Sequence, residues 1–148
     1  MPKMIFVNLP VEDVAKATAF YEAIGFAKNP KFSNEHASSM VWSDAIYVML
    51  LGRDFYATFT PKPIADARTT SGALYALAFD SKADVDTITE AAIAAGGGEP
   101  HGPEDHGFMY SRAFEDLDGN GWGPFWMDPA AAENGPPEHA SASDGSAQ

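Results

Sequence analysis

The chain has no cysteine among its 148 residues. This absence excludes disulfide frameworks, thiolate zinc sites, iron–sulfur clusters and cysteine nucleophiles. Basic residues are also scarce, since 9 Lys and Arg stand against 21 Asp and Glu and give a net charge of −12. Binding of nucleic-acid phosphates and polybasic attachment to a membrane surface both need a basic face, so we expect neither partner.

Long apolar runs are missing as well. None approaches the roughly 20 residues that a membrane-spanning helix requires, so we expect no membrane partner. The short apolar stretch of residues 1–10 is followed by Glu12 and Asp13, and it lacks the small-residue cleavage site of a signal peptide. Together with the lack of cysteine, this indicates a cytoplasmic protein.

The residues that are present suit a folded domain up to a point near the end of the chain. Apolar residues make up 45% of the chain and aromatic residues 12%, which is too much for intrinsic disorder. Residues 129–148, by contrast, contain no aliphatic side chain larger than Ala, and so cannot offset the entropy lost on folding. We predict a single domain over residues 1–128 and a disordered tail over residues 129–148.

The residues before the tail repeat one pattern of elements. An apolar run typical of a strand is followed by an amphipathic helical pattern and then by short strand candidates. The order βαβββ occurs twice, in a module over residues 1–52 and a module over residues 72–128, joined by a connector over residues 53–71. The expected strands are 4–9, 26–32, 36–42 and 46–51, then 73–79, 99–101, 108–114 and 122–126, with helices at 13–24 and 81–95.

Two short elements carry a family resemblance. Phe20-Tyr21-Glu22 followed by Gly25-Phe26, and later Asp116-Leu117-Asp118-Gly119, resemble the vicinal oxygen chelate superfamily of glyoxalase I, bleomycin resistance proteins and extradiol dioxygenases. The resemblance implies an α+β fold in which two βαβββ modules form a cup-shaped sheet. Proteins similar in this way include lyases, dioxygenases and pure binding proteins, so the fold alone does not decide the function.

In the metal-dependent members of this superfamily, four cup-facing strand positions hold a divalent metal. The resemblance places these positions on Phe6, Met49, Leu74 and Gly123, with Tyr75 in place of Leu74 if the register slips by one. Such cations need His, carboxylate or similar ligands, which these residues do not supply. We therefore predict no metal ligand and no cofactor, with a divalent metal at a shifted site as the alternative.

Strand alternation predicts which side chains line the cup. If Phe6 faces inward, side chains two residues apart share that face, whereas the pattern leaves the facing of Trp42 and Met109 open. Such a lining suits a small apolar or planar molecule, although the same side chains could fill the cup as core. The predicted ligand-binding residues of the strands are Phe6, Asn8, Trp42, Tyr47, Met49, Leu74 and Met109.

The connector is rich in aromatic residues and is the only net-basic stretch of the chain. A loop of this length often acts as a lid or binding loop, so we predict that Phe55, Tyr56, Phe59 and Lys62 lie near the ligand. Contact with a second subunit, or cover for the edge of the sheet, are alternatives. Because this stretch is basic, anionic small molecules are not excluded as ligands.

His101 and His106 are the weak candidates for catalysis. They flank Glu104 and Asp105, and two imidazoles beside two carboxylates could serve acid–base chemistry or hold a metal. The alternative is a solvated polar turn. The sequence therefore favours a metal-free small-molecule binding protein that forms a homodimer, with a lyase or dioxygenase, or a metabolite-sensing interaction module, as alternatives.

Overall fold

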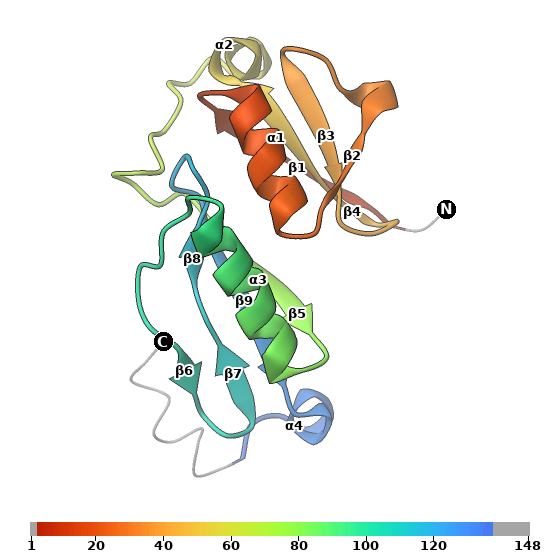
Figure 1. The fold of residues 1–148 in the computed structure, drawn as a ribbon, viewed down its shortest axis with the longest axis vertical. Helices are drawn as coiled ribbons and strands as arrows, with labels where there is room; N and C mark the ends of the chain where they lie inside the picture. Colours follow the sequence, from red (N-terminus) through yellow and green to blue (C-terminus); the bar gives the residue numbers. More distant parts are fainter. Residues whose placement is uncertain (1–2, 138–148) are drawn as a thin grey trace.

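The computed structural model describes residues 3–137, which form two modules placed one above the other in Figure 1. A sheet and a helix make up the body of each module, and both of these helices lie on the near side of their sheets in the view. Across residues 3–137, no helix is long and apolar enough to cross a membrane.

The first module packs one face of its sheet on α1. Its strands run in the order β1-β4-β3-β2, with β1 parallel to β4 and the other pairs antiparallel. Leu9 and Val11 of β1 are buried on the side of α1, whereas Phe6 and Asn8 are exposed on the opposite face. The elements are β1 (Ile5–Val11), α1 (Val14–Ala23), β2 (Ala27–Asn29), β3 (Ala37–Val41) and β4 (Ile46–Gly52).

The second module repeats this arrangement around α3. Its strands run in the order β5-β9-β7-β6, β5 is parallel to β9, and β8 also pairs with β9. Leu77 is buried toward the core, whereas Leu74 and Ala76 are exposed on the opposite face. The elements are β5 (Leu74–Phe79), α3 (Lys82–Ala94), β6 (Glu104–Asp105), β7 (Met109–Ser111), β8 (Phe114–Glu115) and β9 (Gly121–Met127).

Both predicted helices are confirmed, together with the residues that begin them. The side chain of Asp13 accepts a hydrogen bond from the Lys16 N–H, and that of Ser81 accepts one from the Asp84 N–H. Each pair satisfies a donor at a helix start that has no partner within the helix.

The predicted strand over residues 108–114 is split into β7 and β8. Opposite the break lies Pro124 of β9, whose carbonyl accepts the Arg112 N–H at 3.1 Å. Proline has no N–H to donate in return, so the ladder between the strands is interrupted there. This is why the second module has one more strand segment than its repeat pattern predicts.

Two other strand predictions need correction. Residues 99–101 do not form a strand, because Pro100 and Pro103 remove donors there; the edge strand β6 forms later, at residues 104–105. The strand predicted over residues 26–32 ends at Asn29, where Pro30 begins a 3₁₀ turn over Pro30–Phe32.

The connector begins as helix α2 (Arg53–Tyr56), continues as a 3₁₀ turn over Ala57–Phe59, and crosses to the second module without further regular structure. Its second half is held by Arg68, whose guanidinium lies 3.0 Å from the Glu12 carboxylate and 3.3 Å from the Leu117 carbonyl. The connector is thus tied both to the start of α1 and to the turn before β9.

The prediction of disorder from residue 129 onward is wrong for the first residues of that segment, which form α4 (Pro129–Asn134). The Asp128 side chain caps this helix by accepting the Ala130 N–H, and Pro129 suits the first helical position. Ala131 is only 8% exposed, so the helix is anchored by burial. Residues 138–148 of the predicted tail lie outside the described residues.

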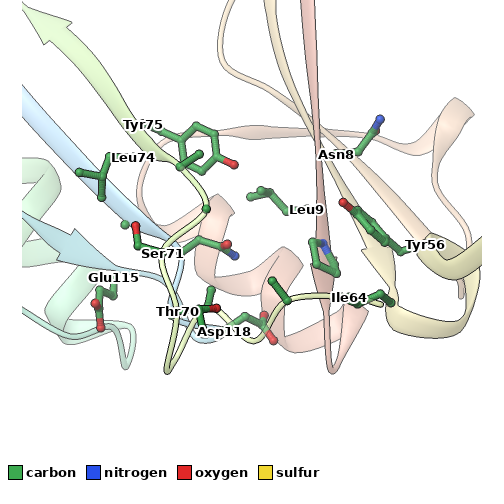
Figure 2. A pocket seen from close by; sticks show the side chains of 18 of the residues that line it. Asn8, Leu9, Tyr56, Ile64, Thr70, Ser71, Leu74, Tyr75, Glu115 and Asp118 are labelled. Atoms are coloured by element: carbon green, nitrogen blue, oxygen red, sulfur yellow. The ribbon is translucent and has the colours of Figure 1, made fainter. Parts of the chain in front are cut away.

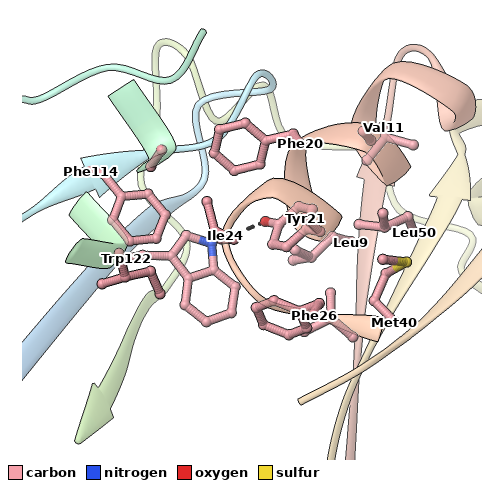
Figure 3. Packing of buried hydrophobic residues seen from close by; sticks show 14 of the residues in the cluster. Leu9, Val11, Phe20, Tyr21, Ile24, Phe26, Met40, Leu50, Phe114 and Trp122 are labelled. Atoms are coloured by element: carbon pink, nitrogen blue, oxygen red, sulfur yellow. Dashed lines mark hydrogen bonds between the residues drawn. The ribbon is translucent and has the colours of Figure 1, made fainter. Parts of the chain in front are cut away.

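The two modules share one aromatic core, shown in Figure 3. The Tyr21 ring of α1 lies 5.3 Å from the Phe26 ring and 6.0 Å from the Trp122 ring of β9. The Trp122 indole N–H donates to the Tyr21 hydroxyl at 3.0 Å, the dashed line of Figure 3. Phe20 of α1 packs near Phe114 of β8, with ring centres 6.4 Å apart.

Candidate functional site

A cavity of about 310 Å³ lies where the two modules meet under the connector. Strand β1 contributes Asn8, β5 contributes Leu74 and Tyr75, and α2 contributes Tyr56 (Figure 2). Ligand pockets usually measure about 300–1,000 Å³ and lie between structural units. This cavity is therefore the candidate binding site.

Helix α2 sets the position of the connector side chains at the cavity. It begins directly after β4, so its place is fixed by the end of a buried strand. Arg53 and Tyr56 are three residues apart and therefore lie on the same side of this helix. Both line the cavity.

Several polar groups of the cavity have unused hydrogen-bonding capacity. Within residues 3–137, the Asn8 amide and the hydroxyls of Tyr56 and Tyr75 have no hydrogen-bond partner. Burial raises the pKa of the Tyr75 phenol, and the nearby Tyr56 phenol and Asp116 carboxylate raise it further. Tyr75 is therefore a neutral donor at physiological pH, available to a ligand.

The two aspartates of the Asp116-Leu117-Asp118-Gly119 element hold the fold together. Asp116 is buried and accepts the Tyr21 hydroxyl at 2.6 Å and the backbone N–H groups of Asp118 and Asn120 at 2.9 Å. Asp118 accepts the Glu12 N–H at 2.9 Å, which links the turn to the first module. Burial raises the pKa of Asp118 above its usual value. These contacts give both aspartates a structural role in the turn.

The sheet faces opposite the helices carry most of the strand residues predicted to line the cup. Phe6 is 51% exposed and stacks on Tyr47, with ring centres 4.5 Å apart and planes 8° apart. Met49 shares this face, because it pairs with Asn8 in the register of β1 and β4. In the second module, Leu74 is 80% exposed, and β7 places Met109 on the same face by alternation.

Eight of the eleven predicted ligand-binding residues do not line the cavity: Phe6, Tyr47, Met49 and Met109 on these sheet faces, and Trp42, Phe55, Phe59 and Lys62 elsewhere. Trp42 packs in the core, 4.9 Å from the Phe26 ring and 5.8 Å from the Phe79 ring. Of the connector residues predicted near the ligand, only Tyr56 lines the cavity. Phe55 and Phe59 pack edge to face with ring centres 5.1 Å apart, and Lys62 is exposed to solvent.

The two histidines predicted as weak catalytic candidates also lie away from the cavity. The exposed ring of His101 makes a 2.9 Å contact with the Gly102 carbonyl. His106 lies in the turn between β6 and β7, with its Nε2 3.9 Å from the Glu104 carboxylate. Neither lines the cavity.

Comparison with known proteins decides what kind of fold this is. Residues 3–38 match a family model for the N-terminal part of bleomycin resistance protein-like proteins, whereas no curated protein matches the sequence. A hypothetical protein from S. aureus is similar in structure, with 21% identity and a TM-score of 0.72 over 86% of this chain and 95% of that one. A glyoxalase/bleomycin resistance protein/dioxygenase family enzyme from Burkholderia phytofirmans is 19% identical, with a TM-score of 0.70 over 85% and 99%. This chain has the vicinal oxygen chelate fold.

A further relative with the vicinal oxygen chelate fold is a fosfomycin resistance protein from Mesorhizobium loti, 15% identical with a TM-score of 0.66 over 90% of this chain and 98% of that one. At these identities the likeness establishes the fold and leaves the activity open. The predicted fold class, two βαβββ modules of an α+β protein, is confirmed.

The metal that this fold often holds does not suit the residues present here. The four positions carry Phe6, Met49, Leu74 and Gly123, and the register keeps Leu74, rather than Tyr75, on the exposed sheet face. Among residues 3–137, no three His, Asp or Glu side chains are grouped so that they could hold a metal ion. Aromatic, thioether and aliphatic side chains do not bind hard cations, so these four positions do not fit the metal.

Among the cavity residues that sequence reasoning missed are Arg53, Tyr75 and Glu115. Tyr75 faces the core side of β5 by alternation, and only its place at the start of the strand brings it to the cavity. Glu115 reaches the cavity because β8 pairs with β9 at Gly121, which itself pairs with Leu74. Aligning the two sequence repeats could have suggested that Glu115, Gly121 and Leu74 lie side by side across three strands. It could not have shown that the connector covers the cavity beside them.

Proposed function

We propose that the protein binds a small, largely planar or apolar molecule without a metal, in the cavity between its modules. The observation that carries this proposal is a cavity of about 310 Å³ lined by Asn8, Tyr56 and Tyr75, whose polar groups have no protein partner within residues 3–137. Polar groups left unpaired beside an apolar wall are typical of a ligand site.

A ligand screen with a blocking variant tests this proposal. The purified protein is screened against planar aromatic metabolites by thermal shift, with and without divalent metals and with chelator, and hits are measured by calorimetry. Ala65→Trp fills the cavity and should abolish binding, whereas Ala130→Trp, on the exposed side of α4, should not. Binding that needs an added metal, or that survives Ala65→Trp, would contradict the proposal.

We also propose that the chain forms a homodimer through the sheet faces opposite its helices. Phe6, Tyr47, Met49 and Leu74 lie on these faces, and Phe6 and Leu74 are largely exposed. Exposed apolar faces of this kind favour a protein partner. Light scattering should give twice the chain mass, and Phe6→Glu with Leu74→Glu should give the monomer; a wild-type monomer would refute the dimer.

The enzyme and sensing roles are the alternatives to this proposal. A lyase or dioxygenase with a shifted metal would need a donor group that residues 3–137 do not show, and a sensing module would need a partner. The cytoplasmic location stays a prediction that rests on the lack of a signal-peptide pattern and of cysteine. Cell fractionation would test it.

A further inference from the structure

Of the three charged side chains that line the cavity, Arg53 and Glu115 lie toward its opposite ends. Figure 2 shows Glu115 of β8 at one end and Tyr56 of α2 at the other. Arg53 lines the cavity from the same side of α2 as Tyr56, one helical turn earlier. One end therefore offers a cation and a phenol, and the other offers a carboxylate.

The protein itself uses neither of these two charges. Within residues 3–137, the Arg53 guanidinium and the Glu115 carboxylate have no ion pair and no hydrogen bond to another side chain. Asp118, also at the cavity, is different, because it accepts the Glu12 N–H and lies 3.8 Å from Arg68. Charges in a partly enclosed site lose hydration, and a partner of opposite charge offsets that loss.

The wall between the two ends carries both apolar and polar side chains. Leu9, Pro10 and Leu74 form its apolar part, and the Tyr75 phenol is one of the neutral donors along it. The apolar part of this wall accepts an apolar spacer such as an aromatic ring between the two charged ends.

We propose that the cavity binds a zwitterionic small molecule, with its acidic group at Arg53 and Tyr56 and its amine at Glu115. This inference rests on the proposed function, because it names the class of molecule bound at that same site. Charge-assisted hydrogen bonds at both ends fix the orientation of the molecule.

The charge of the whole chain favours a zwitterion over a simple ion. A net charge of −12 repels a plain anion, although Arg53 alone would accept one. A plain cation pairs with Glu115 but leaves Arg53 without a partner. A zwitterion satisfies both side chains and brings no net charge into the cavity.

Three molecules of the same shape test the inference at neutral pH by calorimetry. The zwitterion is para-(aminomethyl)benzoate, and para-methylbenzoate and para-methylbenzylamine each keep one of its charges. The zwitterion should bind about tenfold tighter than either relative, the effect expected from one added charge-assisted hydrogen bond. Arg53→Gln should remove its advantage over the amine, and Glu115→Gln its advantage over the acid.

Matched variants control for a general change in surface charge. Lys62→Gln and Glu22→Gln remove exposed charges away from the cavity and should leave all three affinities unchanged. If the three molecules bind equally and Ala65→Trp blocks all of them, the preference for a zwitterion is overturned and the proposed function is kept. If none of the three molecules binds, the zwitterion proposal is overturned. If the thermal-shift screen also finds no ligand, the proposed function is overturned as well.

Discussion

Among single residues, Tyr21 connects the modules through its hydroxyl. It donates to the Asp116 carboxylate at 2.6 Å and accepts the Trp122 indole N–H at 3.0 Å, while its ring is fully buried. Burial and the neighbouring Asp116 raise the pKa of this phenol well above its usual value, so the group stays protonated. The tyrosine of the Phe-Tyr-Glu element is therefore explained by its structural role, which is separate from ligand binding.

Replacing Tyr21 with Phe should lower the free energy of unfolding by about 1–3 kcal/mol, because Trp122 and Asp116 each lose a buried partner. Urea titration at neutral pH measures this loss. Tyr47→Phe is the control, since the exposed Tyr47 hydroxyl donates only to the Asp44 carbonyl, and it should cost less than about 0.5 kcal/mol. Equal losses would show that the link through Tyr21 adds nothing.

Asp118 should make the stability of the protein depend on pH. Its pKa is raised in the folded state, mainly by burial, so the folded state takes up this proton before the unfolded state does. The contribution of Asp118 to stability therefore increases as the pH falls from above the pKa of the folded state to below that of the unfolded state. The pKa of Asp118 in the unfolded state is about 4. Relative to Asp118→Asn, the wild type should gain stability between pH ~7 and ~4 in parallel urea titrations. A constant difference across this range would contradict the raised pKa.

At the scale of elements, the turn before β9 fits closely against the connector. Gly119 has φ +91°, and a Cβ built on it would lie 2.7 Å from the Arg68 nitrogen. This close approach places the returning connector, and with it the wall of the cavity.

Two glycine variants separate backbone strain from this contact. Gly107→Ala also forces a side chain into a positive φ, of +80°, but meets no atom within 4 Å, so it should cost about 1 kcal/mol. Gly119→Ala must also displace the connector and should cost at least about 2 kcal/mol. Thermal unfolding measures both; the same loss at the two sites would mean that the contact with Arg68 is unimportant.

Elements and their order could be predicted from the sequence, because caps such as Asp13 and Ser81 act locally. The division of β7 from β8 could not, because it depends on Pro124, which lies opposite only after the chain has folded back. The same holds for the site. Alternation along strands placed Asn8 and Leu74 on one face, but the cavity also needs α2, whose position depends on the whole first module.

On the scale of the whole molecule, α4 extends the ordered chain beyond the domain predicted over residues 1–128. A chain that ends at Asp128 loses the burial of Ala131 and should melt a few degrees lower, for roughly 1 kcal/mol. The reference for this comparison is a chain that ends at Pro137 and so keeps α4. Calorimetry on these two chains tests this, and equal melting of both would show that α4 adds no stability.

The aromatic core shared by α1 and β9 has a consequence for how the chain can be divided. Because Tyr21 packs on Trp122 and bonds to Asp116, each module buries part of its own apolar surface only against the other. Two fragments cut in the exposed connector between Lys62 and Pro63 should each stay largely unfolded alone and should assemble when mixed. The protein would then behave as a split protein: each fragment folds only when it associates with the other. The cavity would form again where the two fragments meet.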